Sequence, residues 1–147
     1  MRATLLLADY AVVANGKLTI VGGGWTVTGP EPQPFAIALK LEVPWHAALD
    51  GHTVQLELLD ADGQPVRTPS PEGETPVRVE ARLDPQQAEM PEGAKPGVPI
   101  DVALAFNFPP LPLPPASGFE WRLTIDGESR EDWFLAFSTR AVPVVEG

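Results

Sequence analysis

Five segments of the chain alternate between large apolar residues and small or polar ones, with a period of two. From Phe35 onward, for example, the odd positions are large and apolar whereas the even positions are small or charged. Successive side chains of a β-strand point to opposite faces, so each segment has one face for a core and one for solvent. The pattern predicts half-buried strands of antiparallel sheet. The five segments span residues 35–43, 54–58, 77–83, 100–108 and 119–125.

Three more strands are expected at 4–13, 17–21 and 133–137, where the alternation is weaker. The first and the last are apolar on both sides, as in a central strand or a strand that a loop covers. Asn15-Gly16 suits the type I′ turn of a hairpin between the first two segments. Two Asp-Gly pairs mark further tight turns, because glycine readily adopts a positive φ. These pairs stand at 62–63 and 126–127.

The chain has 18 prolines, and they fall in the gaps between the predicted strands. Proline cannot donate to a sheet ladder, so this distribution supports the strand predictions. Helix is scarce: one turn is expected at 46–50 and a short helix at 84–90, with Asp84 as its N-cap. The stretches 67–76 and 84–99 are expected to be mobile loops.

The 147 residues are expected to form a single domain, residues 1–147. Short strands with turn signals between them predict an all-β fold with little helix. The expected architecture is an antiparallel β-sandwich of about eight to ten strands, of the Greek-key, immunoglobulin-like type. A partly open β-barrel is the alternative, and the sequence does not separate the two.

Acidic residues number 20 and basic residues 10, so the net charge is −10. That charge argues against nucleic acid and against anionic membrane surfaces as partners. Cysteine is absent, which excludes a disulfide scaffold and a zinc site built on thiolates. The N-terminal apolar run is too short for a secretory leader, and no stretch approaches the ~20 apolar residues of a membrane span. We therefore expect a soluble, cytoplasmic protein.

No segment assembles a recognisable reactive centre. The glycine triplet 22–24 is followed by neither a helix nor the Lys-Ser/Thr of a phosphate loop, so it predicts a bulge or a close backbone approach. The run 60–63 lacks most ligands of a calcium loop. A metal site from His46, His52 and Asp50 is conceivable, but histidines in an exposed loop are far commoner than such sites. We expect no catalytic residue, no cofactor and no bound metal.

Acidic residues at two places are the strongest candidates for hydrolytic chemistry. Asp9 interrupts an apolar strand and predicts a bend or bulge at Asp9–Tyr10, because a buried carboxylate would need a partner. The carboxylates of 126–132 surround a predicted turn, which is too wet to push the pKa values of an acid and a base apart. They are therefore expected to form a solvated acidic loop or a docking site for a basic partner.

Aromatic and leucine side chains near strand ends are the candidates for an interaction surface. Trp25 and Trp45 stand beside glycine and proline, where an aromatic residue can anchor a partner, stack on a sugar or cover the end of a sandwich. Segment 109–115 favours polyproline II, and it can offer a PxxP face or cross between sheets with its leucines plugging the edge. The candidates are Trp25, Phe35, Trp45, Leu111 and Leu113.

Characteristic stretches occur along nearly the whole chain: residues 5–9, the hairpin into 22–25, the corner 43–45, and the runs 59–63 and 121–127. Together they resemble a family of small bacterial proteins of unknown function, a resemblance that implies no activity and no residue roles. More loosely, 118–127 is similar to a late strand of immunoglobulin-like sandwiches. The cysteine pair of antibody domains is missing, so this second likeness concerns architecture alone.

These observations favour a non-enzymatic module that binds a protein partner or associates with itself through an exposed strand edge. A second hypothesis is a β-sandwich that binds a small ligand or a carbohydrate on Trp25 and Trp45. The third, a hydrolase, would use Asp9 or the carboxylates of 126–132.

Overall fold

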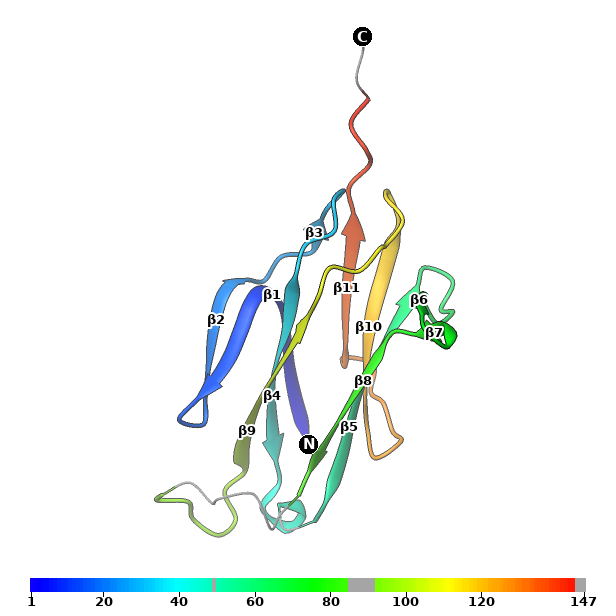
Figure 1. Ribbon diagram of the computed structural model, residues 1–147. Helices are drawn as coiled ribbons and strands as arrows, with labels where there is room; N and C mark the ends of the chain where they lie inside the picture. Colours follow the sequence, from blue (N-terminus) through cyan, green and yellow to red (C-terminus); the bar gives the residue numbers. More distant parts are fainter. Residues whose placement is uncertain (49, 85–91, 145–147) are drawn as a thin grey trace.

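The computed structural model describes residues 1–48, 50–84 and 92–144, and within them the chain is built almost wholly from β-strands (Figure 1). The one helical element there is a single 3₁₀ turn, η1 (Trp45–Ala47). The strands are β1 (Arg2–Ala14), β2 (Lys17–Gly23), β3 (Val27–Thr28), β4 (Phe35–Val43), β5 (His52–Asp60), β6 (Arg67–Ser70), β7 (Gly73–Pro76), β8 (Arg78–Leu83), β9 (Ile100–Phe108), β10 (Gly118–Ile125) and β11 (Phe134–Thr139).

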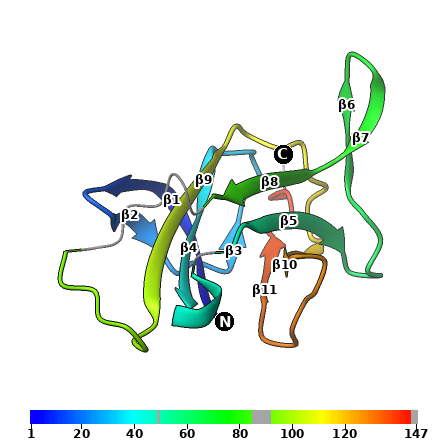
Figure 2. The ribbon, with the colours of Figure 1, turned by 90° about the horizontal axis from the view of Figure 1, so that it is seen from below.

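The strands form two main sheets that face each other (Figure 2). One sheet has the order β2-β1-β4-β9, and the other has the order β3-β11-β10-β5-β8. All neighbouring strands are antiparallel except β3 and β11, which are parallel. The fold is all-β, as predicted, with a sandwich-like layout in which a curled antiparallel sheet forms a half-barrel. That curl explains why the sequence pattern also admitted a partly open barrel.

The clearest predictions of strand position are confirmed. β4 and β9 coincide with the predicted segments 35–43 and 100–108. The prediction of a mobile loop at 67–76 is wrong, because β6 and β7 pair there as a hairpin that projects beyond the sandwich (Figure 2). Pro69 and Pro76 lie within this hairpin. Both strands of a two-stranded hairpin are edge strands, so a proline whose nitrogen faces outward removes no hydrogen bond between the strands. The helix expected at 84–90 lies outside the described residues beyond Asp84.

The main core lies between the two sheets and is centred on aromatic rings. Trp121 of β10 is fully buried, and its ring centroid lies 4.9 Å from that of Phe108. Phe108 in turn stacks on Phe35, with ring centroids 5.0 Å apart. These side chains come from the large apolar positions of the period-two pattern. Because alternate residues of a strand share one face, burying these positions in one core requires the segments to be β-strands.

β1 bends sharply where it changes partner (Figure 1). Pairing of β1 with β4 ends at Ala8↔Ala36, whereas pairing with β2 continues to Ala14↔Lys17. Beyond the bend, β1 no longer pairs with β4, and β1 and β2 continue together as a two-stranded ribbon (Figure 1). This change of partner occurs at the place where the sequence predicted a bend, Asp9–Tyr10. Asp9 is exposed there, so its carboxylate needs no buried partner.

The ribbon, defined as residues 9–23, folds over the back of β4. Ala36 and Ala38, on the opposite side of β4 from the main core, are buried beneath it together with Ala11. Leu18 and Ile20 of β2 pack on these alanines. Because the alanines have single methyl groups, the ribbon can approach the β4 backbone closely.

Asn107 of β9 fastens the bent strand. Its side-chain amide donates to the Ala11 carbonyl at 2.8 Å, and its Oδ1 accepts from the Ala11 N–H at 3.4 Å. Ala11 lies beyond the end of the β1–β4 ladder, so Asn107 supplies bonds that β4 no longer provides. Sequence reasoning did not single out Asn107.

We predict that Ala38→Leu, which inserts a larger side chain beneath the ribbon, lowers the free energy of unfolding by about 1–3 kcal/mol. The matched control is Ala136→Leu on β11, where the alanine is exposed and the change should stay within about 0.5 kcal/mol. Urea denaturation followed by tryptophan fluorescence measures both variants. Equal stability of the two variants would show that the alanines do not limit the approach of the ribbon.

Candidate interaction surface

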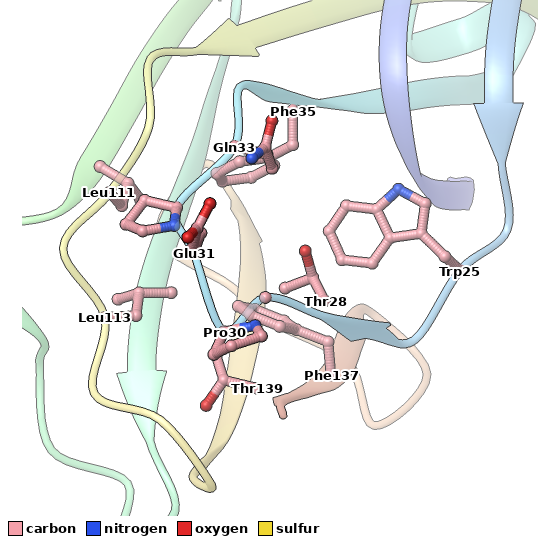
Figure 3. A pocket seen from close by; sticks show the side chains of 12 residues that line it. Trp25, Thr28, Pro30, Glu31, Gln33, Phe35, Leu111, Leu113, Phe137 and Thr139 are labelled. Carbon is pink, nitrogen blue, oxygen red and sulfur yellow. The ribbon is translucent and has the colours of Figure 1, made fainter. Parts of the chain in front are cut away.

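Four of the five predicted contact residues meet at one end of the sandwich. Trp25, Phe35, Leu111 and Leu113 line a single pocket together with Phe137 of β11 (Figure 3). Trp25 lies edge-on to Phe35 and to Phe137, with ring centroids 6.2 Å and 6.1 Å apart. The sequence therefore identified a real cluster, although its members come from four separate parts of the chain.

The members of this cluster serve mainly as packing. Phe35 is only 9% exposed, so its place in a predicted exposed surface is wrong. Leu111 and Leu113 turn inward against the core while the prolines around them are exposed, and a 2.8 Å bond from the Leu113 N–H to the Leu111 carbonyl tightens the segment. The leucines thus plug the edge of the sandwich, which is one of the two roles expected for 109–115.

The space left inside this pocket is small. Its volume is about 30 Å³, enough for about one water molecule. Pockets that hold organic ligands usually enclose about 300–1,000 Å³. A wider hollow of about 300 Å³ lies elsewhere, lined by residues 92–95 and 98–101 of one loop and the start of β9. Neither Trp25 nor Trp45 lines that hollow, so it does not join the predicted stacking residues.

Trp45 does not join the other four contact candidates. It begins η1, which lies at the end of the sandwich opposite β3 (Figure 1). The side chain is half-buried. The predicted set of five residues is therefore two separate features rather than one surface.

His52, at the start of β5, links three segments through its ring. Its Nδ1 lies 2.7 Å from Asp126 Oδ2 in the β10–β11 turn, and its Nε2 lies 2.7 Å from the carbonyl oxygen of Ala47 in η1. Asp126 also accepts from the Thr53 N–H at 2.9 Å. Because both ring nitrogens face oxygen acceptors, the imidazolium, with two N–H donors, fits this position better than the neutral ring.

The electrostatics of this pair agree with that assignment. Burial alone would lower the pKa of His52, but hydrogen bonds to Asp126 and Ala47 and the charges of Asp126 and Asp50 raise it above the usual 6.5. The bonds from His52 and from the Thr53 N–H lower the pKa of Asp126 below its usual 3.8. With both ring nitrogens engaged, His52 has none left for a metal or for a nucleophile. We therefore assign it a structural role.

The remaining acidic candidates are dispersed and exposed. Asp9 lies on the ribbon, whereas Glu128, Glu131 and Asp132 lie at the β10–β11 turn. Across the described residues, no group of three or more histidine, aspartate or glutamate side chains is arranged to hold a metal ion. These carboxylates are thus exposed to solvent on two separate elements.

The ribbon carries the more exposed apolar surface. Tyr10 and Val21 are 50% and 54% exposed, and they face each other as a cross-strand pair of β1 and β2. Val12 lies on the same side and is also exposed. Sequence reasoning missed this surface because 4–13, apolar on both sides, suggested a central or covered strand. The bend accounts for the difference, since it turns the second half of β1 outward.

The free edge of β2 adjoins this apolar pair. The two-residue loop Asn15-Gly16, with φ values of 52° and 71°, makes Ala14↔Lys17 the closing hydrogen-bonded pair of the hairpin. The alternation of an antiparallel ladder then directs the N–H and C=O groups of every second β2 residue away from β1. Those residues are Leu18 and Ile20, and the N–H of Gly22 continues the row before its φ of 60° ends the strand alternation. Within the described chain, no backbone bond outside the ladders engages them.

The glycine triplet shapes the end of that edge. Gly22 has a φ of 60°, and a Cβ atom there would collide with the carboxylate of Asp9. The close approach that the sequence predicted for the triplet is therefore made by the Asp9 side chain. A side chain at Gly22 would displace that carboxylate.

We predict that the contribution of His52 to stability depends on pH. Its raised pKa means that the contribution is complete below pH 6.5 and falls as the pH rises through the folded-state pKa. Relative to His52→Gln, the wild-type protein should lose about 1 kcal/mol of unfolding free energy between pH 6 and pH 9. His46→Gln, at an exposed histidine, is the control and should change nothing. Urea denaturation across this range measures the effect, and parallel curves for wild type and His52→Gln would contradict the assignment.

Comparison with known proteins places the chain in a family without assigning an activity. No curated protein matches the sequence. Separately from these comparisons, the described residues contain no helix with the length and apolar character of a membrane span. A family of unknown function, DUF6941, matches residues 3–137, from the start of β1 into β11. The match covers most of the 147-residue chain, and the chain therefore belongs to this family.

Proposed function

We propose that this protein is a non-enzymatic interaction module whose contact surface is the ribbon, with the edge of β2 at its centre. The observation that supports the proposal most strongly is the open β2 edge beside the exposed Tyr10–Val21 pair. A sheet edge binds an extended segment of another chain through main-chain hydrogen bonds, while neighbouring apolar side chains add specificity. Such binding needs no deep pocket.

The two outer strands of the second sheet, β3 and β8, are better protected than β2. β3 is two residues long, and β8 carries the exposed charges of Arg78, Glu80 and Arg82. Short edges and charged residues are common defences against unwanted strand pairing. β2 is seven residues long, and Lys17 at its first position is its one charged residue. An edge of that length without such a defence suits a strand that pairs with another chain.

The lack of cysteine is compatible with a reducing compartment, and we propose a cytoplasmic location for this module. Carbohydrate binding on Trp25 and Trp45 is less well supported, because they lie at opposite ends of the sandwich. Hydrolysis by Asp9 or by the carboxylates of 126–132 is also less well supported, because all of these side chains are exposed to solvent.

A photo-cross-linking amino acid, p-benzoylphenylalanine, tests this proposal when it replaces Val21. The matched control replaces Val98, which is 53% exposed but lies in the loop before β9. We expect irradiation of cells to give protein adducts from position 21 and few from position 98, because only the first adjoins the β2 edge. Equal yields from both positions, or no adduct from position 21, would contradict the proposal. Circular dichroism of both variants verifies that the fold is intact.

A further inference from the structure

We infer that the strand added to β2 is the β2 strand of a second copy of this chain, paired antiparallel about a two-fold axis. This inference rests on the proposed function and names its partner. In such a symmetric contact, the same surface patch of each copy meets the other. Three properties of the ribbon support it: the direction of its free backbone groups, its exposed face and its charge pattern.

The free backbone groups of β2 are self-complementary. Leu18 and Ile20 direct both their N–H and C=O groups outward, as the hairpin geometry requires, and the N–H of Gly22 continues this row. A two-fold axis at Ile20 places Ile20 opposite its symmetry mate and Leu18 opposite Gly22 of the second copy. Each outward-facing residue then meets another outward-facing residue, which is the condition for an antiparallel ladder.

The exposed face of the ribbon continues across the same axis. A two-fold axis perpendicular to the sheet keeps the outer faces of both copies on one side. Thr19 of one copy then lies opposite Val21 of the other, and Tyr10 and Val12 lie on the neighbouring β1 strands of the same face. Cross-strand pairs of this kind contribute about 0.2–1 kcal/mol each. The partly exposed apolar side chains of two copies would form one continuous stripe.

The charge pattern favours the antiparallel orientation. The net charge of −10 makes most surfaces of two copies repel, but between residues 10 and 24 the one charged residue is Lys17. The nearest acid along the chain, Asp9, lies over Gly22 at the other end of β2. Antiparallel pairing brings Lys17 of each copy to the Asp9 end of the other. Residues 22–24 are all glycine, so no side chain of that triplet stands between the two charges.

The charges also favour a second copy over an unrelated strand. Because Lys17 and Asp9 lie at opposite ends of the ribbon, pairing of two copies brings together two Lys17–Asp9 pairs. An unrelated strand would have to carry the same two charges at the same spacing. Exposed ion pairs add little affinity, but they fix register and orientation.

Sedimentation equilibrium of the purified protein over a range of concentrations tests the inference. We expect the mass to rise from that of one 15.8 kDa chain to twice that value. Lys17→Glu and Asp9→Lys should each weaken dimerisation by about tenfold, because each turns two attractions into repulsions. The double variant, Lys17→Glu with Asp9→Lys, should restore the wild-type dissociation constant. Both residues are exposed, and circular dichroism verifies the fold of each variant.

Two results would overturn the inference. One is a single-chain mass at every concentration, and the other is a dimer whose dissociation constant ignores both charge reversals. If the purified protein is a single chain while position 21 still cross-links to a different protein in cells, the proposed function stands and only the identity of the partner is wrong. If position 21 gives no adduct at all, both fail.

Discussion

The close packing of the ribbon on the back of β4 is the constraint on which the rest of the structure depends. The small side chains of Ala36 and Ala38 leave room on that face of β4 for Leu18 and Ile20 to pack. This packing allows β1 to bend away from β4. Asn107 then supplies the backbone bonds that Ala11 loses at the bend. As a result β4 is covered on both faces, while β2 becomes an uncovered edge beside exposed apolar residues.

The period-two pattern predicted β4 and β9 to the residue, because each buries its large side chains on one face of the sandwich. It failed at β6 and β7, where proline-rich sequence carries no alternation and the hairpin has little core to bury. It also could not reveal the exposure of Tyr10 and Val21. An apolar strand that changes partner halfway has the same composition as one buried throughout, and only the tertiary bend separates them.

The candidate site shows a similar division. Sequence reasoning selected Trp25, Leu111 and Leu113 as a group worth testing, and they do converge, but the space between them is filled by their own side chains. His52 was considered as a metal ligand, whereas its ring connects η1, β5 and the β10–β11 turn. These candidates for contact and for metal binding therefore pack or bond at the ends of the sandwich. Tyr10 and Val21, which are proposed for binding, are residue types common in any strand, so the sequence does not distinguish them from core residues.

Hydrogen–deuterium exchange of individual β2 amides, measured at low and at high protein concentration, tests the central claim most directly. The N–H groups of Lys17 and Thr19 face β1 and should exchange slowly at both concentrations. Those of Leu18 and Ile20 should exchange fast in dilute solution and slowly when the protein is concentrated. Slow exchange of Leu18 and Ile20 at every dilution would contradict an open edge. Fast exchange at every concentration would contradict its pairing with a second copy.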